Sequence, residues 1–559
     1  MNIDESLWTI NYIDEKKRRQ VLEEAIDMLM DCDDKSILCT YIDAIAFYYD
    51  KLSVKYQTAI LELYSELETC NKCLNCCKNS EYFKNAYRKL LISQKYSNSC
   101  LNYKSSIFAT NITKKQNLSQ SAKVVAIVPD FLSAASFLQP PIDFLIPRTI
   151  AEKENIDFNI IDNRLYHYSF EELNKTVEFA DCIVFSTSPY DHIQNYFLDI
   201  RLKLTFELIK KIKYKNEKKT VIVCGAHGSV RPDIVYKETG ADLILRGEYD
   251  YCLIDIIKRI INNEKLDDRF IYKKEDYLLN KPFSSFEHNI DLYEKHRDVI
   301  PSYDNVDFNN YFGNRHTNNH MVTYSNHATI LASRGCYNNC SFCFNFWGNN
   351  VRFREPQSVV DEMEMLQKKH SVSEIFFIDA TFTQNRKWVI DICLEIIKRG
   401  LKISWSAETR CDRLDPELLR IMAKANCKSL WLGVESYCDC ILKENRKFSS
   451  NRIAIEAINM CKKENIIPKQ FILIGLPGET TDSLNSTICY LKDVKACYTN
   501  SVMVATPRFG TLYYELAKKQ YPHLGCDFYS LTGVKGIVGN HMTPQQLREA
   551  VFKFRNIKF

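Results

Sequence analysis

The stretch SRGCYNNCSFCFN, residues 333–345, places Cys336, Cys340 and Cys343 within eight residues. Structural zinc sites usually have four protein ligands, arranged as paired cysteine or histidine units. This stretch supplies three thiols and has no obvious partner pair nearby. A cubane iron–sulfur cluster has four irons, so three thiolates would leave one iron open to an outside ligand. Methionine, cysteine or histidine side chains elsewhere in the chain could close such a site, so a four-ligand metal site is the alternative.

The cysteine stretch follows the first strand of a repeating strand–helix series. Five further apolar runs follow it, and amphipathic segments with helical spacing separate them: EIFFIDAT, KISWSAET, SLWLGVES, KQFILIGLPG and SVMVATP. Six such units predict a partial (β/α)6 barrel or a larger parallel sheet, whose chemistry is expected at the carboxyl ends of the strands. Five candidate residues from unrelated local sequences fall at those ends, which predicts one active site: Cys336, Asp379, Glu408, Glu435 and Gly475.

A second series of short β-branched strands lies upstream, in residues 123–262. KVVAIVPD, DCIVFSTS and TVIVCGAHG alternate with helical segments, which predicts a doubly wound, Rossmann-like α/β domain with its ligand site at the carboxyl ends of the strands. The other expected parts are a helical region at residues 1–115, a connector at 263–325, a barrel at 326–515 and a C-terminal helical tail at 516–559. The whole chain is therefore predicted to belong to the α/β class.

The composition is that of a globular protein, with 45% hydrophobic and 26% charged residues among 559. The net charge of +4 gives no support for binding a nucleic-acid polyanion. The first residues contain acidic groups and no apolar core, so we expect no secretory signal, and no stretch is apolar enough to predict a membrane span. We therefore expect a cytoplasmic protein in which the 22 cysteines are reduced thiols.

The CxxxCxxC pattern after a strand, with Phe342 before the last cysteine, resembles the radical S-adenosylmethionine (SAM) superfamily over residues 326–515. The resemblance implies that Cys336, Cys340 and Cys343 hold a [4Fe–4S] cluster whose open iron binds SAM. It further implies that an electron, from a donor such as flavodoxin or ferredoxin, cleaves SAM to a 5′-deoxyadenosyl radical, which abstracts hydrogen from a small-molecule or peptide substrate.

The same resemblance suggests which residues contact SAM. The segments FIDATFT, SAETR, WLGVES and LIGLPGET supply most of them, and the full set is Phe342, Asp379, Ala380, Glu408, Arg410, Gly433, Glu435, Gly475, Pro477 and Gly478. The alternative for each carboxylate is a solvated residue at a strand end or a helix cap. The alternative for each glycine is ordinary turn chemistry.

Residues 123–262 resemble the cobalamin-binding domain that precedes the barrel in class B radical SAM methyltransferases. CGAHGSVRPD and ADLILRGEYD carry the resemblance, which suggests that the cofactor contacts Ser186, Ser188, Gly225, His227 and Gly247. Many such domains have Asp-x-His-x-x-Gly after the first strand, with the histidine ligating cobalt. The corresponding VPDFLSAASFLQPP has no histidine, and neither His192 nor His227 fits that motif.

Three functional readings follow from these observations. The leading one is a cobalamin-dependent C-methyltransferase that acts on an unactivated carbon of a peptide or natural-product precursor. The second is a radical SAM enzyme without cobalamin, whose upstream domain recognises the substrate. The third is a non-catalytic metal or cobalamin sensor, which would leave Asp379, Glu408 and Glu435 unexplained.

A second cysteine group, CNKCLNCC, contains Cys70, Cys73, Cys76 and Cys77. Spacings of three would place these thiols near one face of a helix, and Cys100 could add a fourth ligand. A second metal site is one interpretation. Buried free cysteines that behave as small apolar groups are the other.

Overall fold

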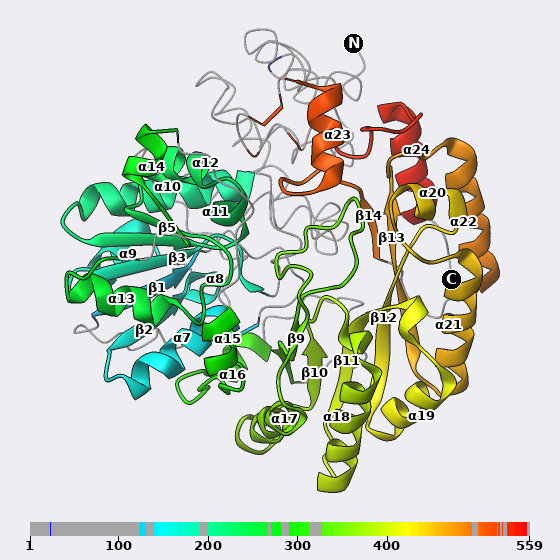
Figure 1. Ribbon diagram of the computed structural model, residues 1–559, viewed down its shortest axis with the longest axis horizontal. Coiled ribbons are helices and arrows are strands. Elements are labelled where there is room, and N and C mark those ends of the chain that lie inside the picture. Colours follow the sequence, from blue (N-terminus) through cyan, green and yellow to red (C-terminus); the bar gives the residue numbers. More distant parts are fainter. Residues whose placement is uncertain are drawn as a thin grey trace, which may run out of the picture.

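The computed structural model describes two six-stranded sheets, the first mixed and the second fully parallel, with three short helices in the connector between them (Figure 1). It describes Glu23 and residues 123–129, 139–166, 168–190, 200–266, 270–280, 290–312, 326–494 and 501–555, the last range apart from 523, 526–527, 529–530 and 532–533. The predicted N-terminal helical region therefore lies outside the described residues, Glu23 excepted.

The first sheet is built from short apolar strands that are buried along nearly their whole length. Its order is β2-β1-β3-β4-β5-β6, and all neighbours are parallel except β5 and β6. Runs such as VVAIV and CIVFS can be buried on both faces because helices cover the sheet on both sides. The strands are β1 (Val124–Val128), β2 (Phe158–Asp162), β3 (Cys182–Ser186), β4 (Thr220–Cys224), β5 (Leu243–Leu245) and β6 (Ile271–Lys273).

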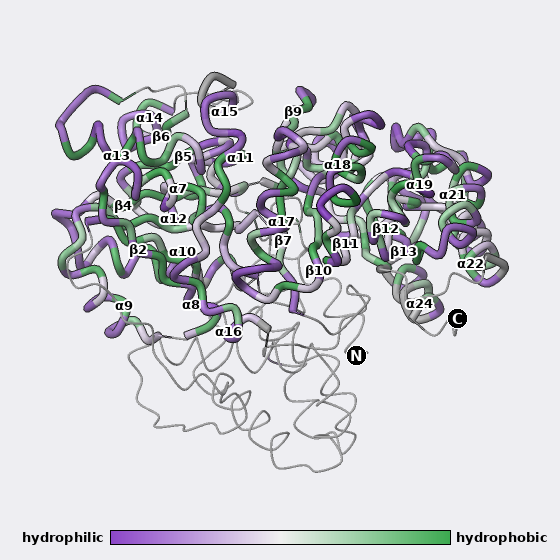
Figure 2. The backbone as a smooth tube through the Cα atoms, turned by 90° about the horizontal axis from the view of Figure 1, so that it is seen from below, coloured by the Kyte–Doolittle hydropathy of each residue, from purple (hydrophilic) through white to green (hydrophobic). Residues whose placement is uncertain are grey.

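Two groups of helices pack on the first sheet. The helices α7 and α13 contact each other, and α10 contacts both α9 and α12 (Figure 1). Figure 2 shows hydrophobic and hydrophilic residues alternating along the helices of this unit, as expected for helices with one face on a sheet. The helices are α7 (Ile142–Lys153), α8 (Asn163–Tyr166), α9 (Phe170–Thr176), α10 (Ile200–Lys215), α11 (Ala226–Val230), α12 (Pro232–Thr239) and α13 (Leu253–Ile261).

The sheet extends beyond residue 262, into the stretch that the sequence pattern assigns to a connector. The strand β6 pairs antiparallel with β5, but its three residues are too few to show a periodic pattern. The described residues of the rest of the connector form three short helices: α14 (Lys274–Leu278), α15 (Ile290–His296) and α16 (Phe308–Phe312).

The second sheet is fully parallel and has the order β14-β13-β12-β11-β10-β7, which is the order of the chain. It curls into a half-barrel with its helices on the outer side (Figure 1). The six-unit barrel expected from the sequence is therefore present. Its strands are β7 (His327–Ile330), β10 (Glu374–Phe377), β11 (Ser404–Arg410), β12 (Cys427–Glu435), β13 (Ile467–Ile474) and β14 (Ser501–Val504).

The barrel helices begin and end at recognisable signals. In α18, Asn385 accepts a hydrogen bond from the Trp388 amide at the first turn, and Gly400 ends the helix in the left-handed region. The helices are α17 (Pro356–His370), α18 (Arg386–Arg399), α19 (Pro416–Lys424), α20 (Asp439–Glu444), α21 (Asn451–Lys463) and α22 (Thr481–Val494). Two 3₁₀ turns, η5 (Phe382–Gln384) and η6 (Cys411–Arg413), follow β10 and β11.

The C-terminal tail packs against the second sheet and also contacts the first unit. Of its helices α23 (Leu512–Gln520) and α24 (Pro544–Arg555), the second contacts β13 and β14. Between these helices the chain reaches the first unit, where Arg231 Nη1 donates to the Gly525 carbonyl at 2.5 Å. The Phe528 ring meets the His227 ring edge-on, with the centroids 5.1 Å apart. The tail thus covers part of the first unit as well as the barrel.

Among the described residues, no helix is both long and apolar enough to cross a membrane.

Candidate active site

The cysteine loop is enclosed by a two-stranded antiparallel ladder, β8 (Ser333–Arg334) with β9 (Arg352–Phe353). At its start Gly335 has φ +94°, and an added Cβ would lie 2.7 Å from the Asn350 carbonyl oxygen. Glycine is therefore required at this position. The Cys336 amide donates to the Gly348 carbonyl at 3.0 Å, so the two ends of the loop are bonded to each other.

The three thiols open onto one cavity of about 390 Å³, inside the carboxyl end of the barrel. Cys343 is exposed, and Cys336 and Cys340 are partly buried. No three histidine, cysteine or acidic side chains in the described part of the chain are close enough together to hold a single metal ion. A cubane cluster does not need that arrangement, because each thiolate binds a different iron.

Cations lie beside the thiols. Arg410 Nη1 is 3.9 Å from Cys340 Sγ, and its guanidinium is held by Asp412 at 2.8 Å. Burial raises the pKa of the Cys340 thiol, and the charges of Lys447 and Arg410 oppose this shift. A thiol must lose its proton to bind iron, so these cations favour the ligating form. The donor set and its charge therefore fit an iron–sulfur cluster.

A buried ion pair between Lys447 and Glu435 forms one wall of the cavity. The sequence pattern predicts Glu435 as a site residue but not Lys447. Lys447 Nζ lies 3.1 Å from Glu435 Oε1, and both side chains are at most 10% exposed. Gly433 makes room for the pair, because a Cβ there would lie 2.8 Å from Lys447 Nζ. Lys447 stands in a charged stretch, ENRKF, which carries no recognisable motif.

Glu435 has φ +67°, which is unusual for a residue with a side chain. The register between β12 and β13 shifts at the same point. Backbone held in a costly conformation is typical of functional sites, where surrounding contacts fix it. This irregularity turns Glu435 into the cavity beside the cysteine loop.

Glu408 lines the same cavity. Burial raises the pKa of its carboxyl to about 7, and the charges of Glu435 and Asp379 add to the shift. Near neutral pH this carboxyl is therefore balanced between its neutral and its charged form, which makes it responsive to a cationic ligand.

The variant Glu408→Gln is expected to be more stable than the parent at about pH 8, by roughly 2–3 kcal/mol, and equally stable below about pH 4.5. The pKa is higher in the folded chain than in the unfolded chain. The parent therefore has its full stability below the unfolded value of 4.5 and loses stability as the pH rises through about 7. Urea unfolding of the metal-free protein across this range measures the difference. Glu549→Gln, on the exposed side of α24, should show no such trend; an equal trend in both variants would refute the assignment.

Most of the predicted SAM-contacting residues line this one cavity: Phe342, Ala380, Glu408, Arg410, Gly433 and Glu435. Asp379 does not line it. Its side chain is fully buried and accepts hydrogen bonds from the Ala332 amide at 3.2 Å and the Ser333 hydroxyl at 2.5 Å. It therefore fixes the chain where it enters the cysteine loop.

The glycine segment after β13 also lies behind the cavity and does not line it. The Gly475 carbonyl accepts from the Tyr513 hydroxyl at 3.2 Å, and the Pro477 carbonyl accepts from Asn445 Nδ2 at 2.9 Å. Gly478 has φ +82° and lies against the Glu444 carboxylate. Asn445 in turn bonds Ser341 of the cysteine loop, so this segment supports the site from outside.

The five residues suggested as cobalamin contacts gather at the carboxyl edge of the first sheet. Their polar groups bond within the protein: Ser186 Oγ to the Tyr249 hydroxyl at 3.2 Å, Ser188 Oγ to the Ala226 amide at 2.6 Å, and His227 Nδ1 to the Thr187 hydroxyl at 3.1 Å. The Gly247 amide donates to Ser229 Oγ, which donates to the Gly225 carbonyl. All five are buried.

A larger cavity, of about 980 Å³, lies between this edge and the cysteine loop. Its first-domain wall contains Ser229, Arg231 and Arg246, and its opposite wall contains Cys340 and Cys343. Four asparagines of the cysteine loop also line it: Asn338, Asn339, Asn345 and Asn349. Both cavities therefore reach the same thiols from different sides.

Three features named in the sequence analysis cannot be placed. His192, residues 130–138 of the stretch VPDFLSAASFLQPP, and the cysteines Cys70, Cys73, Cys76, Cys77 and Cys100 lie outside the described residues.

Comparison with known families identifies the barrel. Residues 330–490 match the radical SAM superfamily, so this part of the chain is a radical SAM domain and the protein is a radical SAM enzyme. An uncharacterized methyltransferase of Pyrococcus horikoshii is 25% identical over 77% of this chain and 91% of its own length. The anaerobic magnesium-protoporphyrin IX monomethyl ester cyclase of Rubrivivax gelatinosus is 27% identical, but only over 56% of each chain.

Two solved structures share the fold across both units. The radical SAM methyltransferase TsrM of Kitasatospora setae, described with cobalamin and a [4Fe–4S] cluster bound, superposes with a TM-score of 0.54. The identity is 15%, covering 71% of this chain and 78% of TsrM. The cobalamin-dependent radical SAM enzyme OxsB gives a TM-score of 0.55 at 17% identity, covering 76% of this chain and 58% of OxsB.

Proposed function

We propose that the protein is a cobalamin-dependent radical SAM C-methyltransferase that modifies an unactivated carbon of a peptide or natural-product precursor. The observation that carries this proposal is the cavity of about 980 Å³ between the carboxyl edge of the first sheet and the cysteine loop. Parallel sheets bind ligands at the carboxyl ends of their strands. Here residues at the carboxyl ends of both sheets line the same cavity. The methyltransferase name of the relative that matches most of the chain supports the same reading.

Cys336, Cys340 and Cys343 would hold the [4Fe–4S] cluster, with Arg410 and Lys447 balancing part of its negative charge. When bound, the cluster supplies one electron to SAM and yields a carbon radical able to abstract hydrogen. We propose that a flavodoxin or ferredoxin delivers this electron, and the 55% exposure of Tyr337, beside Cys336, supports an approach from that side.

SAM carries an ammonium, a carboxylate and a sulfonium, and the smaller cavity offers groups of matching charge. Lys447 would hold the carboxylate, while Glu435 and Glu408 would face the cationic groups. A cation favours the ionised form of Glu408, so its raised pKa should fall when SAM binds. Trp431 and Phe471 give the cavity an apolar wall for the substrate.

The larger cavity suits the corrin of cobalamin, whose periphery carries amides and whose nucleotide arm carries a phosphate. The asparagines of the cysteine loop are partners for amides, and Arg246 is a partner for a phosphate. Bound there, cobalamin supplies the methyl group. His227 does not line the cavity and is enclosed by Phe206 and Phe528, so we propose that it is not a cobalt ligand.

One observation favours the second candidate, a radical SAM enzyme without cobalamin. Ser186, Ser188 and His227 are fully buried and bond to other groups of the protein, so their side chains are not exposed to a ligand at this edge. In that case the larger cavity would bind part of the substrate.

Cobalamin bound per chain separates the two candidates. The protein would be produced anaerobically with cobalamin supplied, desalted, and analysed by corrin absorbance and iron content. We expect about one corrin per chain, and a loss of most of it in Arg246→Ala with the iron unchanged. SAM turnover should then yield S-adenosylhomocysteine together with 5′-deoxyadenosine. Iron-replete protein without corrin, releasing 5′-deoxyadenosine alone, would overturn the proposal in favour of the second candidate.

A further inference from the structure

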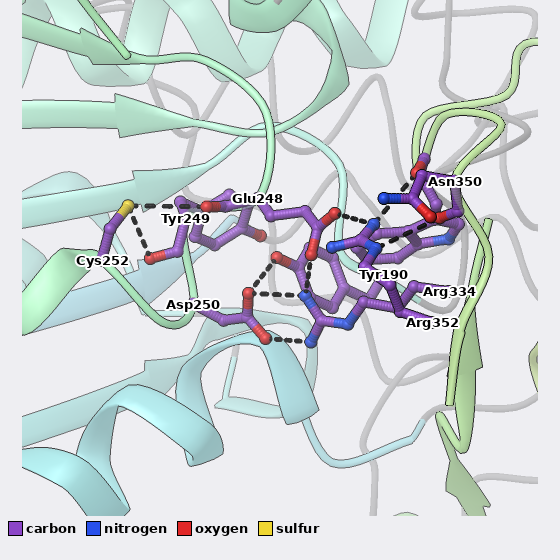
Figure 3. A network of polar contacts seen from close by, with 9 residues as sticks. Tyr190, Glu248, Tyr249, Asp250, Cys252, Arg334, Asn350 and Arg352 are labelled. Carbon is purple, nitrogen blue, oxygen red and sulfur yellow. Dashed lines mark hydrogen bonds and ion pairs between the residues drawn. The ribbon is translucent and has the colours of Figure 1, made fainter. Parts of the chain in front are cut away.

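Two arginines at the base of the cysteine loop bind two carboxylates of the first unit. Arg334 in β8 bonds Asp250 through both terminal nitrogens, and its Nη1 lies 2.6 Å from Glu248 Oε2. Arg352 in β9 bonds the other oxygen of Glu248. Figure 3 shows these four side chains meeting between the two units, and we call them the clamp.

The clamp is removed from water. Each of its four side chains is at most 4% exposed. The Arg334 guanidinium lies 4.4 Å from the centre of the Tyr251 ring and 4.8 Å from that of Trp347. The Tyr190 hydroxyl donates to Asp250 Oδ1 at 2.8 Å. Charges buried this deeply are stable only when they are paired and hydrogen-bonded. A displacement that breaks one of these bonds would therefore cost free energy.

The clamp is placed so that it contacts both the cysteine loop and the edge of the first sheet. Arg334 and Arg352 face each other across the β8–β9 ladder, so together they grip both ends of the cysteine loop. Glu248 and Asp250 follow β5, at the edge that borders the larger cavity through Arg246. The contact therefore joins the loop that would hold the cluster to the edge that would hold cobalamin.

We infer that Arg334 is a positioning residue: the clamp fixes the cysteine loop against the first sheet and thereby sets the separation of the two cofactor sites. This inference rests on the proposed function for the identity of the second cofactor, but not for the fixing of the loop. A methyl group can reach a short-lived carbon radical only if both sites keep a constant geometry. Apolar packing alone would allow the two units to slide, whereas bidentate pairs between planar groups specify one orientation.

The test compares Arg334→Lys with a matched control, Arg354→Lys. Lysine keeps the charge but loses the fork that bonds Asp250 through two nitrogens. Arg354 is equally buried, lies two residues beyond Arg352, and pairs with Glu362 of α17 at 2.5 Å, so it touches no carboxylate of the first unit in the bonds described. Hydrogen exchange is read on peptides covering 335–351 and 386–399 of the full-length, cofactor-free protein.

We expect exchange in 335–351 to accelerate by about 10-fold or more in Arg334→Lys, with 386–399 unchanged. Arg354→Lys should leave 335–351 at the parent rate. Unchanged exchange of the loop in Arg334→Lys, or equal acceleration in both variants, would overturn the inference. Should Arg334→Lys not fold, Arg352→Lys tests the same clamp from its other arginine.

A second readout addresses the separation itself. In protein loaded with both cofactors, pulsed electron paramagnetic resonance measures the dipolar coupling between the reduced cluster and cob(II)alamin. The parent and Arg354→Lys should give one narrow distance distribution, and Arg334→Lys a broadened or shifted one. An unchanged distribution would overturn the positioning role. Parent protein that binds no cobalamin would instead refute the proposed function, and the exchange experiment would still decide the clamp.

Discussion

Replacing any one of Cys336, Cys340 and Cys343 by alanine should lower reductive cleavage of SAM by at least about 1,000-fold. Each thiolate would bind a different iron, so losing one leaves a second iron open and the cluster exposed to dissociation. We expect no substitute ligand, because no other thiol of the described residues lines the cavity. The measurement is 5′-deoxyadenosine released under dithionite, together with iron and sulfide per chain.

The matched control for the cysteine variants is another thiol of the same unit. Cys461→Ala in α21 removes a fully buried cysteine outside the cavity and should retain both the iron and the cleavage. Full activity in any one variant of the loop would refute the cluster assignment. If Cys461→Ala also lost activity, the losses in the loop variants could result from misfolding and would not support the cluster assignment.

Gly475→Ala should destabilise the protein by about 3–4 kcal/mol, the largest effect we expect from a single methyl group. Gly475 has φ +77°, and its new Cβ would lie 2.4 Å from the carbonyl oxygen of Gly536 in the C-terminal tail. The obstacle is backbone and cannot rotate away, so either the tail or β13 must move. The midpoint of denaturant unfolding measures the effect.

Gly400→Ala separates the two causes of that loss. Gly400 has φ +64°, but no atom outside its immediate chain neighbours lies within 4 Å of the added Cβ. It should therefore show only the conformational cost, about 1 kcal/mol. Equal losses in the two variants would mean that the close approach of the tail to Gly475 contributes nothing.

The half-barrel and its site were largely predictable, because they depend on local signals. Runs such as EIFF and SLWLGVE are apolar and lie between amphipathic helices, and Glu408 and Glu435 stand at their carboxyl ends. The three cysteines stand in one short motif. Strand-end position therefore predicts that these residues gather at one end of the barrel.

What escaped prediction depends on contacts between distant segments. Lys447 faces Glu435 only because the chain after α20 folds back over β12. Asp379 has the same strand-end position as Glu435, but its carboxylate is turned to the neighbouring backbone, which no sequence pattern reveals. The clamp joins residues 84 positions apart, Arg334 and Asp250, through side chains that read as ordinary surface charges.

The C-terminal tail contacts the first unit at two places: Gly525 bonds Arg231, and Phe528 packs on His227. These contacts can form only after the tail has been translated. The first unit leaves the ribosome with this part of its edge uncovered, and the residues that cover it are translated only after the barrel strands. Chains that stop before residue 525 lack the cover altogether. The edge of the first sheet is therefore more accessible to a large cofactor during translation than after the tail has folded over it. We expect cobalamin to bind faster when it is supplied during expression than when it is added to the folded protein.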